Sequence, residues 1–182
     1  MAAMNTMQWL NPPPVWSESR STITMTTGPR TDFWRVTHYG FTRDSGHFYY
    51  TVVTGDFTAQ ARIIGQYKDL YDQAGLMVRE NEHTWMKCGI EYVQGVQHAS
   101  AVVTRDYSDW SVTPLAQEPD AVWLRVRREG GALEIHYSVD GAAFTLLRLG
   151  YLSQADALQV GVMCASPEGS GFTVEFHDFS VM

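Results

Sequence analysis

Cysteine and lysine are both scarce in this 182-residue chain, and each scarcity excludes a class of protein. The two cysteines, Cys88 and Cys164, are too few for a disulfide framework and are not spaced as zinc ligands. The two lysines, Lys68 and Lys87, belong to a set of 13 basic residues that stand against 20 acidic ones, which gives a net charge of −7. Because an acidic chain repels phosphate groups, we expect neither a nucleic-acid partner nor an anionic membrane surface.

Long apolar runs and leader signals are also missing. No stretch approaches the roughly 20 apolar residues that a membrane-spanning helix needs. Residues 1–7 lack the basic cluster and following apolar stretch that mark a signal peptide, so we expect a cytoplasmic location. No linker rich in Ser, Gly or Pro, no charge run and no internal repeat divides the chain. We therefore expect one domain over residues 1–182.

What the sequence does contain is a two-residue alternation of apolar and polar side chains, interrupted by glycine-rich turns. The alternation indicates roughly ten to thirteen short strands. The clearest lie at 21–26, 47–53, 57–64, 73–78, 85–92, 99–105, 122–127, 133–138, 144–149, 158–164 and 172–176. Gly55-Asp56 and Asp140-Gly141 each stand between two such segments, which predicts a β-hairpin at both places. Many short strands with regular turns are typical of an antiparallel sandwich or barrel.

Two segments read less clearly as strands. Residues 69–80 and 153–158 could each form a short helix, although Gly75 costs the first about 1 kcal/mol relative to alanine. Neither alternative changes the fold class, which we predict to be all-β.

Several tracts resemble a bacterial and fungal family of unknown function that includes a fungal regulation-of-enolase protein. They are TDFW at 31–34, GHF at 46–48, YDQAGLM at 71–77, WMKCGIEY at 85–92 and SDWS at 108–111. The resemblance implies a concanavalin A-like jelly roll, an antiparallel two-sheet sandwich with a concave face like those of lectins and glucanases. It implies no established reaction, because the family is poorly characterised.

A candidate site follows from the alternation along 85–92. If Met86, Cys88, Ile90 and Tyr92 point into the sandwich, then their neighbours share the opposite face. That face would carry Gln73, Lys87 and Glu91 as a polar floor, with Met77 and Trp85 as an apolar wall. Gly75 and Gly89 would remove bulk between them and leave a groove. The alternative interpretation is a surface ion pair between Lys87 and Glu91, worth under about 1 kcal/mol.

Two carboxylates beside tryptophans complete the candidate site as its rim. Asp32 precedes Trp34 by two residues, and Asp109 precedes Trp110, each pair near a predicted turn. Binding residues concentrate on loops that a rigid scaffold holds. The alternatives are a turn in which Asp109 bonds its own backbone and a core position for Trp34.

Catalysis is a second possibility, with Glu91 as acid or base acting on a glycoside. Glycosidases need a pair of carboxylates, and Asp32, Asp109 and Glu175 could supply the other member. The Glu-x-Asp-x-Glu pattern of jelly-roll glucanases is absent, however. The histidines show no metal-ligand spacing, and His47 suits a structural hydrogen bond.

The sequence thus favours non-catalytic binding of a carbohydrate or sugar-derived small molecule, with no cofactor and no metal. The alternatives are a glycoside-active enzyme that uses Glu91 and a protein-interaction module that regulates a metabolic enzyme. Edge strands of such sandwiches often pair between subunits, so a homodimer is also an expectation.

Overall fold

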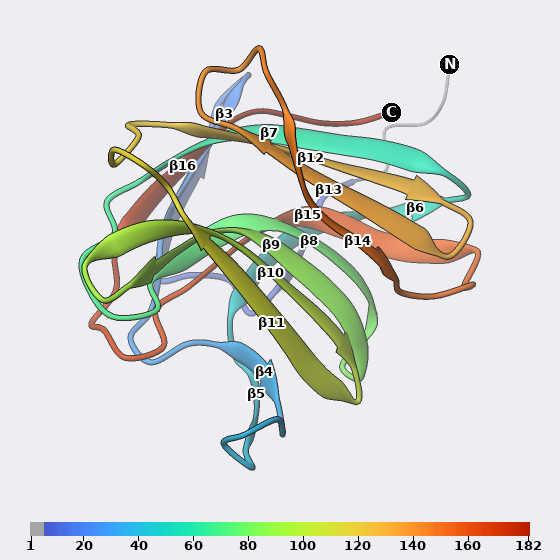
Figure 1. The fold of residues 1–182 in the computed structure, drawn as a ribbon, viewed down its shortest axis with the longest axis horizontal. Helices are drawn as coiled ribbons and strands as arrows, with labels where there is room; N and C mark the ends of the chain where they lie inside the picture. The colour runs from blue at the N-terminus through green and yellow to red at the C-terminus, as the bar shows by residue number, and fades with distance from the viewer. Residues whose placement is uncertain (1–5) are drawn as a thin grey trace.

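A computed structural model describes residues 6–182 of the chain, which form an all-β protein with two antiparallel sheets. Figure 1 shows the two sheets stacked face to face, with a short hairpin below the first. The first sheet has seven strands in the order β1–β6–β15–β8–β9–β10–β11. Its strands are β1 Gln8–Leu10, β6 His47–Thr54, β8 Gln73–Asn81, β9 Thr84–Val93, β10 Val96–Arg105, β11 Tyr107–Pro114 and β15 Ala157–Ala165.

The second sheet also has seven strands, in the order β14–β13–β12–β7–β16–β3–β2. These are β2 Val15–Glu18, β3 Thr22–Thr26, β7 Phe57–Gly65, β12 Val122–Glu129, β13 Ala132–Ser138, β14 Thr145–Tyr151 and β16 Thr173–Val181. The separate hairpin joins β4 Phe33–Arg35 to β5 Thr42–Asp44. No helix long and apolar enough to cross a membrane occurs within residues 6–182.

The core lies between the two sheets and follows from the alternation of each strand. Leu76 and Met86 point into it from the first sheet, and Leu124 and Phe176 from the second, all fully buried. Burying such side chains removes apolar surface from water, which is the main force that holds the sheets together. The predicted all-β sandwich is therefore confirmed.

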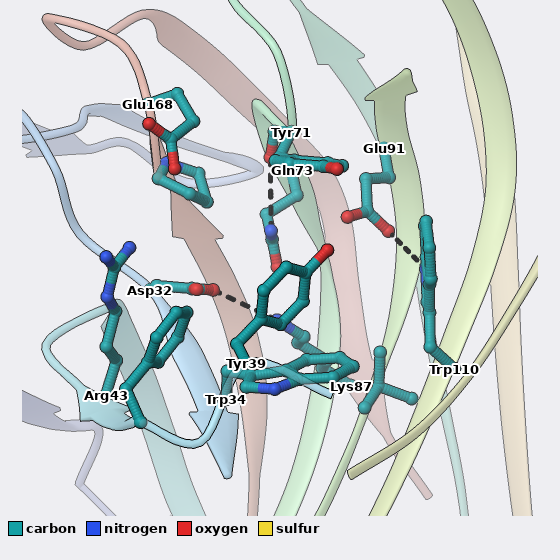
Figure 2. Close-up of a pocket in the computed structure, with 13 residues that line it drawn as sticks. Asp32, Trp34, Tyr39, Arg43, Tyr71, Gln73, Lys87, Glu91, Trp110 and Glu168 are labelled. Carbon is teal, nitrogen blue, oxygen red and sulfur yellow. Dashed lines mark hydrogen bonds and ion pairs between the residues drawn. The ribbon is translucent and has the colours of Figure 1, made fainter. Parts of the chain in front are cut away.

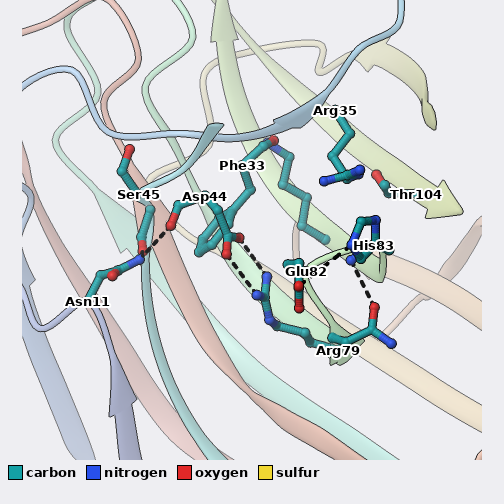
Figure 3. Close-up of polar contacts among 12 residues, drawn as sticks. Asn11, Phe33, Arg35, Asp44, Ser45, Arg79, Glu82, His83 and Thr104 are labelled. Carbon is teal, nitrogen blue, oxygen red and sulfur yellow. Dashed lines mark hydrogen bonds and ion pairs between the residues drawn. The ribbon is translucent and has the colours of Figure 1, made fainter. Parts of the chain in front are cut away.

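The first sheet also buries its other face, and this feature places the candidate site. The β4–β5 hairpin covers that outer face and forms a second, smaller core with it. The core consists of Phe33, Trp34, Phe48, Met77, Trp85, Val102, Met163 and Ala165. Arg79 of β8 holds the hairpin by a two-pronged ion pair with Asp44, at 2.7 and 2.8 Å (Figure 3).

The strands predicted at 73–78 and 158–164 are present as β8 and β15, so both helical alternatives are excluded, and one hairpin prediction is wrong. Residues 69–80 contain no helix, because β8 occupies the middle of the first sheet between β15 and β9. Residues 153–156 form a loop, and residues 157–158 begin β15. The segments that flank Gly55-Asp56 are not a hairpin, since β6 belongs to the first sheet and β7 to the second. Local alternation specifies a strand but not its partner.

Candidate functional site

A cavity of about 100 Å³ lies on the outer face of the first sheet, beside the hairpin (Figure 2). This volume is several times the roughly 10–15 Å³ that one water needs, so the cavity has room for a small molecule. Six residues of the predicted site line it: Asp32, Trp34, Gln73, Lys87, Glu91 and Trp110. Seven further residues complete the lining: Tyr39, Phe41, Arg43, Tyr71, Val102, Pro167 and Glu168.

The floor comes from β8 and β9, and the predicted alternation along 85–92 is confirmed there. Met86, Cys88 and Ile90 pack in the core between the sheets. Lys87 and Glu91 lie on the opposite face, where Glu91 stands across from Gln73 of β8. Both charged side chains are buried, with 5% and 7% of their surface exposed.

The glycines between these floor residues let the strands approach. Gly75 faces Gly89 across β8 and β9. A Cβ atom added to Gly75 would lie 1.7 Å from the carbonyl oxygen of Cys88, and one added to Gly89 would lie 2.0 Å from that of Ala74. The backbone itself therefore requires glycine at both positions, in addition to the side-chain space that they leave open on the floor.

Lys87 binds the hairpin rather than Glu91. Its ammonium donates a 2.6 Å hydrogen bond to the backbone carbonyl of Phe33 and forms a 3.4 Å ion pair with Asp32. The same Asp32 oxygen accepts a hydrogen bond from the backbone N–H of Phe33. The expected surface pair between Lys87 and Glu91 is thus replaced by a buried pair that fastens β4 to β9.

Glu91 is held at one of its two oxygens. Oε2 accepts hydrogen bonds from the Ser100 hydroxyl at 2.7 Å and from the indole N–H of Trp110 at 2.8 Å. Burial raises the pKa of Glu91 above its ordinary value, while Lys87 and the two hydrogen bonds partly oppose the rise. The other oxygen is directed toward the cavity in Figure 2.

Aromatic rings form the walls. The rings of Trp34 and Tyr39 meet edge to face with centroids 5.7 Å apart, and those of Tyr71 and Trp110 do so at 6.3 Å. Tyr39 also stacks on Phe41 at 5.4 Å. A hydrogen bond with Tyr39, together with burial, raises the pKa of Tyr71 to about 12. The phenol groups of Tyr39 and Tyr71 therefore meet beside the cavity, and that of Tyr71 stays protonated at neutral pH.

Two further charged residues, Arg43 and Glu168, line the cavity. The Arg43 guanidinium stands 4.2 Å above the ring centre of Phe41, in a cation–π contact. Glu168 lines the cavity on the side opposite Trp110 (Figure 2). Among residues 6–182, no cluster of three or more His, Cys, Asp or Glu side chains could hold a metal ion.

Three residues of the predicted site lie elsewhere. Met77 and Trp85 are buried in the small core under the hairpin, so they support the cavity and do not form its wall. Their positions on the outer face are as predicted, but the covering hairpin was not foreseen. Asp109 lies within β11 on an exposed edge, where it pairs with Arg148 at 3.1 Å. Neither a turn nor the cavity involves it.

Trp34 and Trp110 both line the cavity, and Trp34 also has the core position that the sequence analysis gave as its alternative. Trp34 belongs to the small core and also lines the cavity, and its indole N–H donates to the Thr37 carbonyl at 3.0 Å. Trp110 is partly exposed and binds Glu91. His47 has the structural role expected of it: it accepts from the backbone N–H of Gly28 and bonds the carbonyl of Asn11.

Sequence reasoning missed the aromatic residues of the hairpin turn and the residues of a distant loop. Tyr39 and Phe41 lie between β4 and β5, and Arg43 lies within β5, strands too short to show an alternation; Glu168 lies in the loop after β15. A signal for the turn was present, since three aromatic residues within 34–41 are more than a solvent-exposed loop needs. No pattern in the sequence brings Glu168 to the cavity.

Comparison with known proteins identifies relatives over almost the whole chain. The protein named Regulation of enolase protein 1 of Saccharomyces cerevisiae is 43% identical over 173 residues, which cover 95% of this chain and 87% of the relative. An uncharacterised protein of Emericella nidulans is 26% identical over 159 residues, or 82% of this chain and 79% of that protein. A crystal structure of a functionally unknown Saccharomyces cerevisiae protein superposes with a TM-score of 0.93 at 42% identity, covering 97% of this chain and 95% of the other.

More distant structures share the fold alone. The mutant GH43 protein BlXynB of Bacillus licheniformis superposes with a TM-score of 0.74 at 15% identity, covering 98% of this chain but 37% of that one. The carbohydrate-binding module CBM66 of Bacillus subtilis gives a TM-score of 0.59 at 12% identity, with 95% and 94% coverage. These neighbours identify the sandwich as a jelly roll of the type found in glycosidases and carbohydrate-binding modules. Residues 9–182 match a described family, and the chain therefore belongs to the family "Protein of unknown function (DUF1349)".

Proposed function

We propose that this protein binds a carbohydrate or a sugar-derived small molecule in the cavity, without catalysing a reaction on it. The observation that carries the proposal is the combination of a polar floor with aromatic walls. Gln73, Lys87 and Glu91 supply hydrogen-bonding groups, and Tyr39 and Trp110 supply ring faces. A sugar needs both, because its hydroxyls require polar partners while its C–H face packs on aromatic rings.

Two further features support the proposal. The floor is rigid, since Lys87 and Glu91 are already fixed by hydrogen bonds and need little ordering when a ligand binds. One neighbour of the same fold is named a carbohydrate-binding module, and others are named xylosidases or GH43 proteins. At identities of 12–15% these names support a class of ligand and not a particular sugar.

Calorimetric titration with D-glucose, D-galactose and D-xylose, beside the same titrations of Tyr39→Ala, tests the proposal. Tyr39 is 49% exposed, so its removal leaves the fold intact while it removes a wall of the cavity. We expect affinity for the bound sugar to fall about tenfold. Tyr107→Ala is the matched control, because Tyr107 is 64% exposed and lies outside the cavity. Absence of binding by every saccharide would overturn the proposal.

A glycoside-active enzyme is the second candidate, and the environment of Glu91 favours it. Burial raises the pKa of this carboxyl group, as general acids of glycosidases require. Asp32 and Glu168 are the other carboxylates that line the cavity, but Asp32 is occupied by its pairing with Lys87. Turnover of aryl glycosides by the wild type, lost in Glu91→Gln, would support this candidate over simple binding.

A protein-interaction module is the third candidate, and it rests on the name of the yeast relative, Regulation of enolase protein 1. Exposed apolar side chains that could meet a partner include Trp16 and Leu149 on the second sheet. A titration of purified enolase with this protein tests the interaction directly.

A further inference from the structure

Glu91 is a buried carboxylate that forms no ion pair within the part of the chain that the structure describes. None of the ion pairs among residues 6–182 includes it, although only 7% of its surface is exposed. Both of its hydrogen bonds reach Oε2, from Ser100 and Trp110. The other oxygen, Oε1, is directed into the cavity (Figure 2). A buried charge is costly unless an opposite charge joins it, and the attraction of Lys87 offsets only part of this cost because Lys87 forms its ion pair with Asp32.

The two cations of the cavity do not supply that partner. Lys87 places its ammonium against Asp32 and the carbonyl of Phe33. Arg43 lies over the ring of Phe41 at the other end of the cavity. Of the three carboxylates that line the cavity, Asp32 pairs with Lys87 and Glu168 is exposed to solvent, so Glu91 is the buried one without an ion pair among residues 6–182.

The walls around Oε1 also favour a cation. The cavity is lined by four aromatic rings that meet in two edge-to-face pairs, Tyr71 with Trp110 at 82° and Trp34 with Tyr39 at 73°. The face of an aromatic ring carries a partial negative charge and attracts ammonium groups. A cavity of about 100 Å³ suits an ammonium with its nearest substituents.

We infer that the ligand of this cavity carries an organic ammonium group, which lies between Oε1 of Glu91 and the surrounding rings of Tyr39, Tyr71 and Trp110. If the ammonium group belongs to an amino sugar, this inference depends on the proposed carbohydrate-binding function. A small alkylammonium such as choline has the same chemistry, and the experiment separates the two sources.

The test is calorimetric titration of the full chain with D-glucosamine, D-glucose, N-acetyl-D-glucosamine and choline chloride, at a pH where the free amine is protonated. We expect glucosamine to bind at least about tenfold more tightly than the two neutral sugars, because only it carries the charge. Glu91→Gln keeps an acceptor for Ser100 and Trp110 but removes the charge. It should lower the affinity for glucosamine to that for glucose and so abolish the preference for the amine.

Glu134→Gln is the matched control, because it makes the same change of net charge on β13 of the second sheet. Equal affinity for glucose and glucosamine, or an amine preference that survives in Glu91→Gln, overturns the ammonium inference and leaves the proposed carbohydrate function standing. Binding of choline without any sugar supports the ammonium inference and overturns the carbohydrate function. If none of the four compounds binds, both are overturned.

Discussion

At the residue scale, Glu91 has the most unusual environment in the cavity. Its position on β9 opposite Gln73 places it on the outer face, and the Trp110 indole from β11 covers it. Ser100 and Trp110 satisfy one oxygen, which is too little to offset the loss of water around a carboxylate. Such a group is retained at a cost to stability, as is common at binding and catalytic sites.

This cost predicts a pH-dependent effect of Glu91→Gln. The pKa of Glu91 is raised in the folded protein, so the folded state holds the proton more tightly than the unfolded state. Its favourable contribution is present below the unfolded pKa of about 4.3 and is lost as the pH rises through the folded pKa. We therefore expect Glu91→Gln to exceed the wild type in free energy of unfolding at neutral pH, and the excess to vanish in acid.

Urea unfolding over a series of pH values measures this difference. The charged and titratable groups that face Glu91 are Lys87, Asp32, Tyr71, Glu168 and its cross-strand neighbour His98, and all remain in the variant. Their contributions therefore cancel in the comparison to first order. A variant less stable than the wild type at neutral pH would contradict the assigned environment.

At the scale of elements, the β4–β5 hairpin packs on the outer face of the first sheet and supplies one side of the cavity. Trp34, Tyr39, Phe41 and Arg43 all come from the hairpin or its turn. The turn includes Val36 at a φ of 59°, a conformation that a β-branched residue rarely adopts. Such strain persists only where surrounding contacts determine the backbone, and here the small core and the Arg79–Asp44 pair do so.

Loss of that pair should loosen the hairpin. Asp44→Ala leaves the guanidinium of Arg79 buried, at 5% exposure, without its carboxylate. We expect the free energy of unfolding to fall by about 3 kcal/mol, measured by urea unfolding, with faster tryptic cleavage at Arg43. Asp109→Ala is the control: it breaks an Asp–Arg pair whose Asp side chain is 70% exposed, and it should cost under about 1 kcal/mol. Equal effects of the two variants would argue against the anchoring role.

The close approach of β8 and β9 at Gly75 and Gly89 predicts that a larger residue there destabilises the protein. Gly75→Ala would place a Cβ atom 1.7 Å from the backbone oxygen of Cys88, so the two central strands would have to separate. We expect a loss of about 3 kcal/mol or more in urea unfolding. In Gly150→Ala on β14 the nearest atom would be 3.6 Å away, and that variant should fold with near wild-type stability. A Gly75→Ala protein as stable as Gly150→Ala would contradict the close approach of the strands.

At the scale of the whole molecule, the two sheets bury both cysteines between them. Cys88 of β9 and Cys164 of β15 are fully packed, and Cys164 contacts Met25 of the second sheet. Burial raises the pKa of the Cys88 thiol to about 12 and that of Cys164 still further. The reactive thiolate is therefore absent at neutral pH in the folded state.

Thiol labelling should consequently report the unfolding of the entire sandwich. We expect both cysteines to resist an aromatic disulfide reagent in buffer and to react together across the urea transition. The labelling midpoint should coincide with that of tryptophan fluorescence. Rapid reaction of one cysteine under native conditions would indicate that a sheet opens locally.

Much of this architecture could be predicted from local pattern. The alternation in β9 placed Lys87 and Glu91 on one face and Met86 and Cys88 on the other, because successive residues of a strand point to opposite sides. The short strands β4 and β5 could not be found this way, since three residues are too few to show an alternation of apolar and polar side chains. The same limit concealed the burial of Trp85, whose cover comes from that hairpin.

The sequence alone determined the class of the fold, the strands and which side chains share a face, since these depend on neighbours along the chain. Tertiary structure decided which strands pair, as the separation of β6 and β7 into different sheets illustrates. It also decided that Lys87 pairs with Asp32, while Glu91 forms no ion pair with any residue of 6–182. The physical reason is that a charge is stabilised by whatever lies within a few ångströms, and the residues around Glu91 come from segments far apart in the chain.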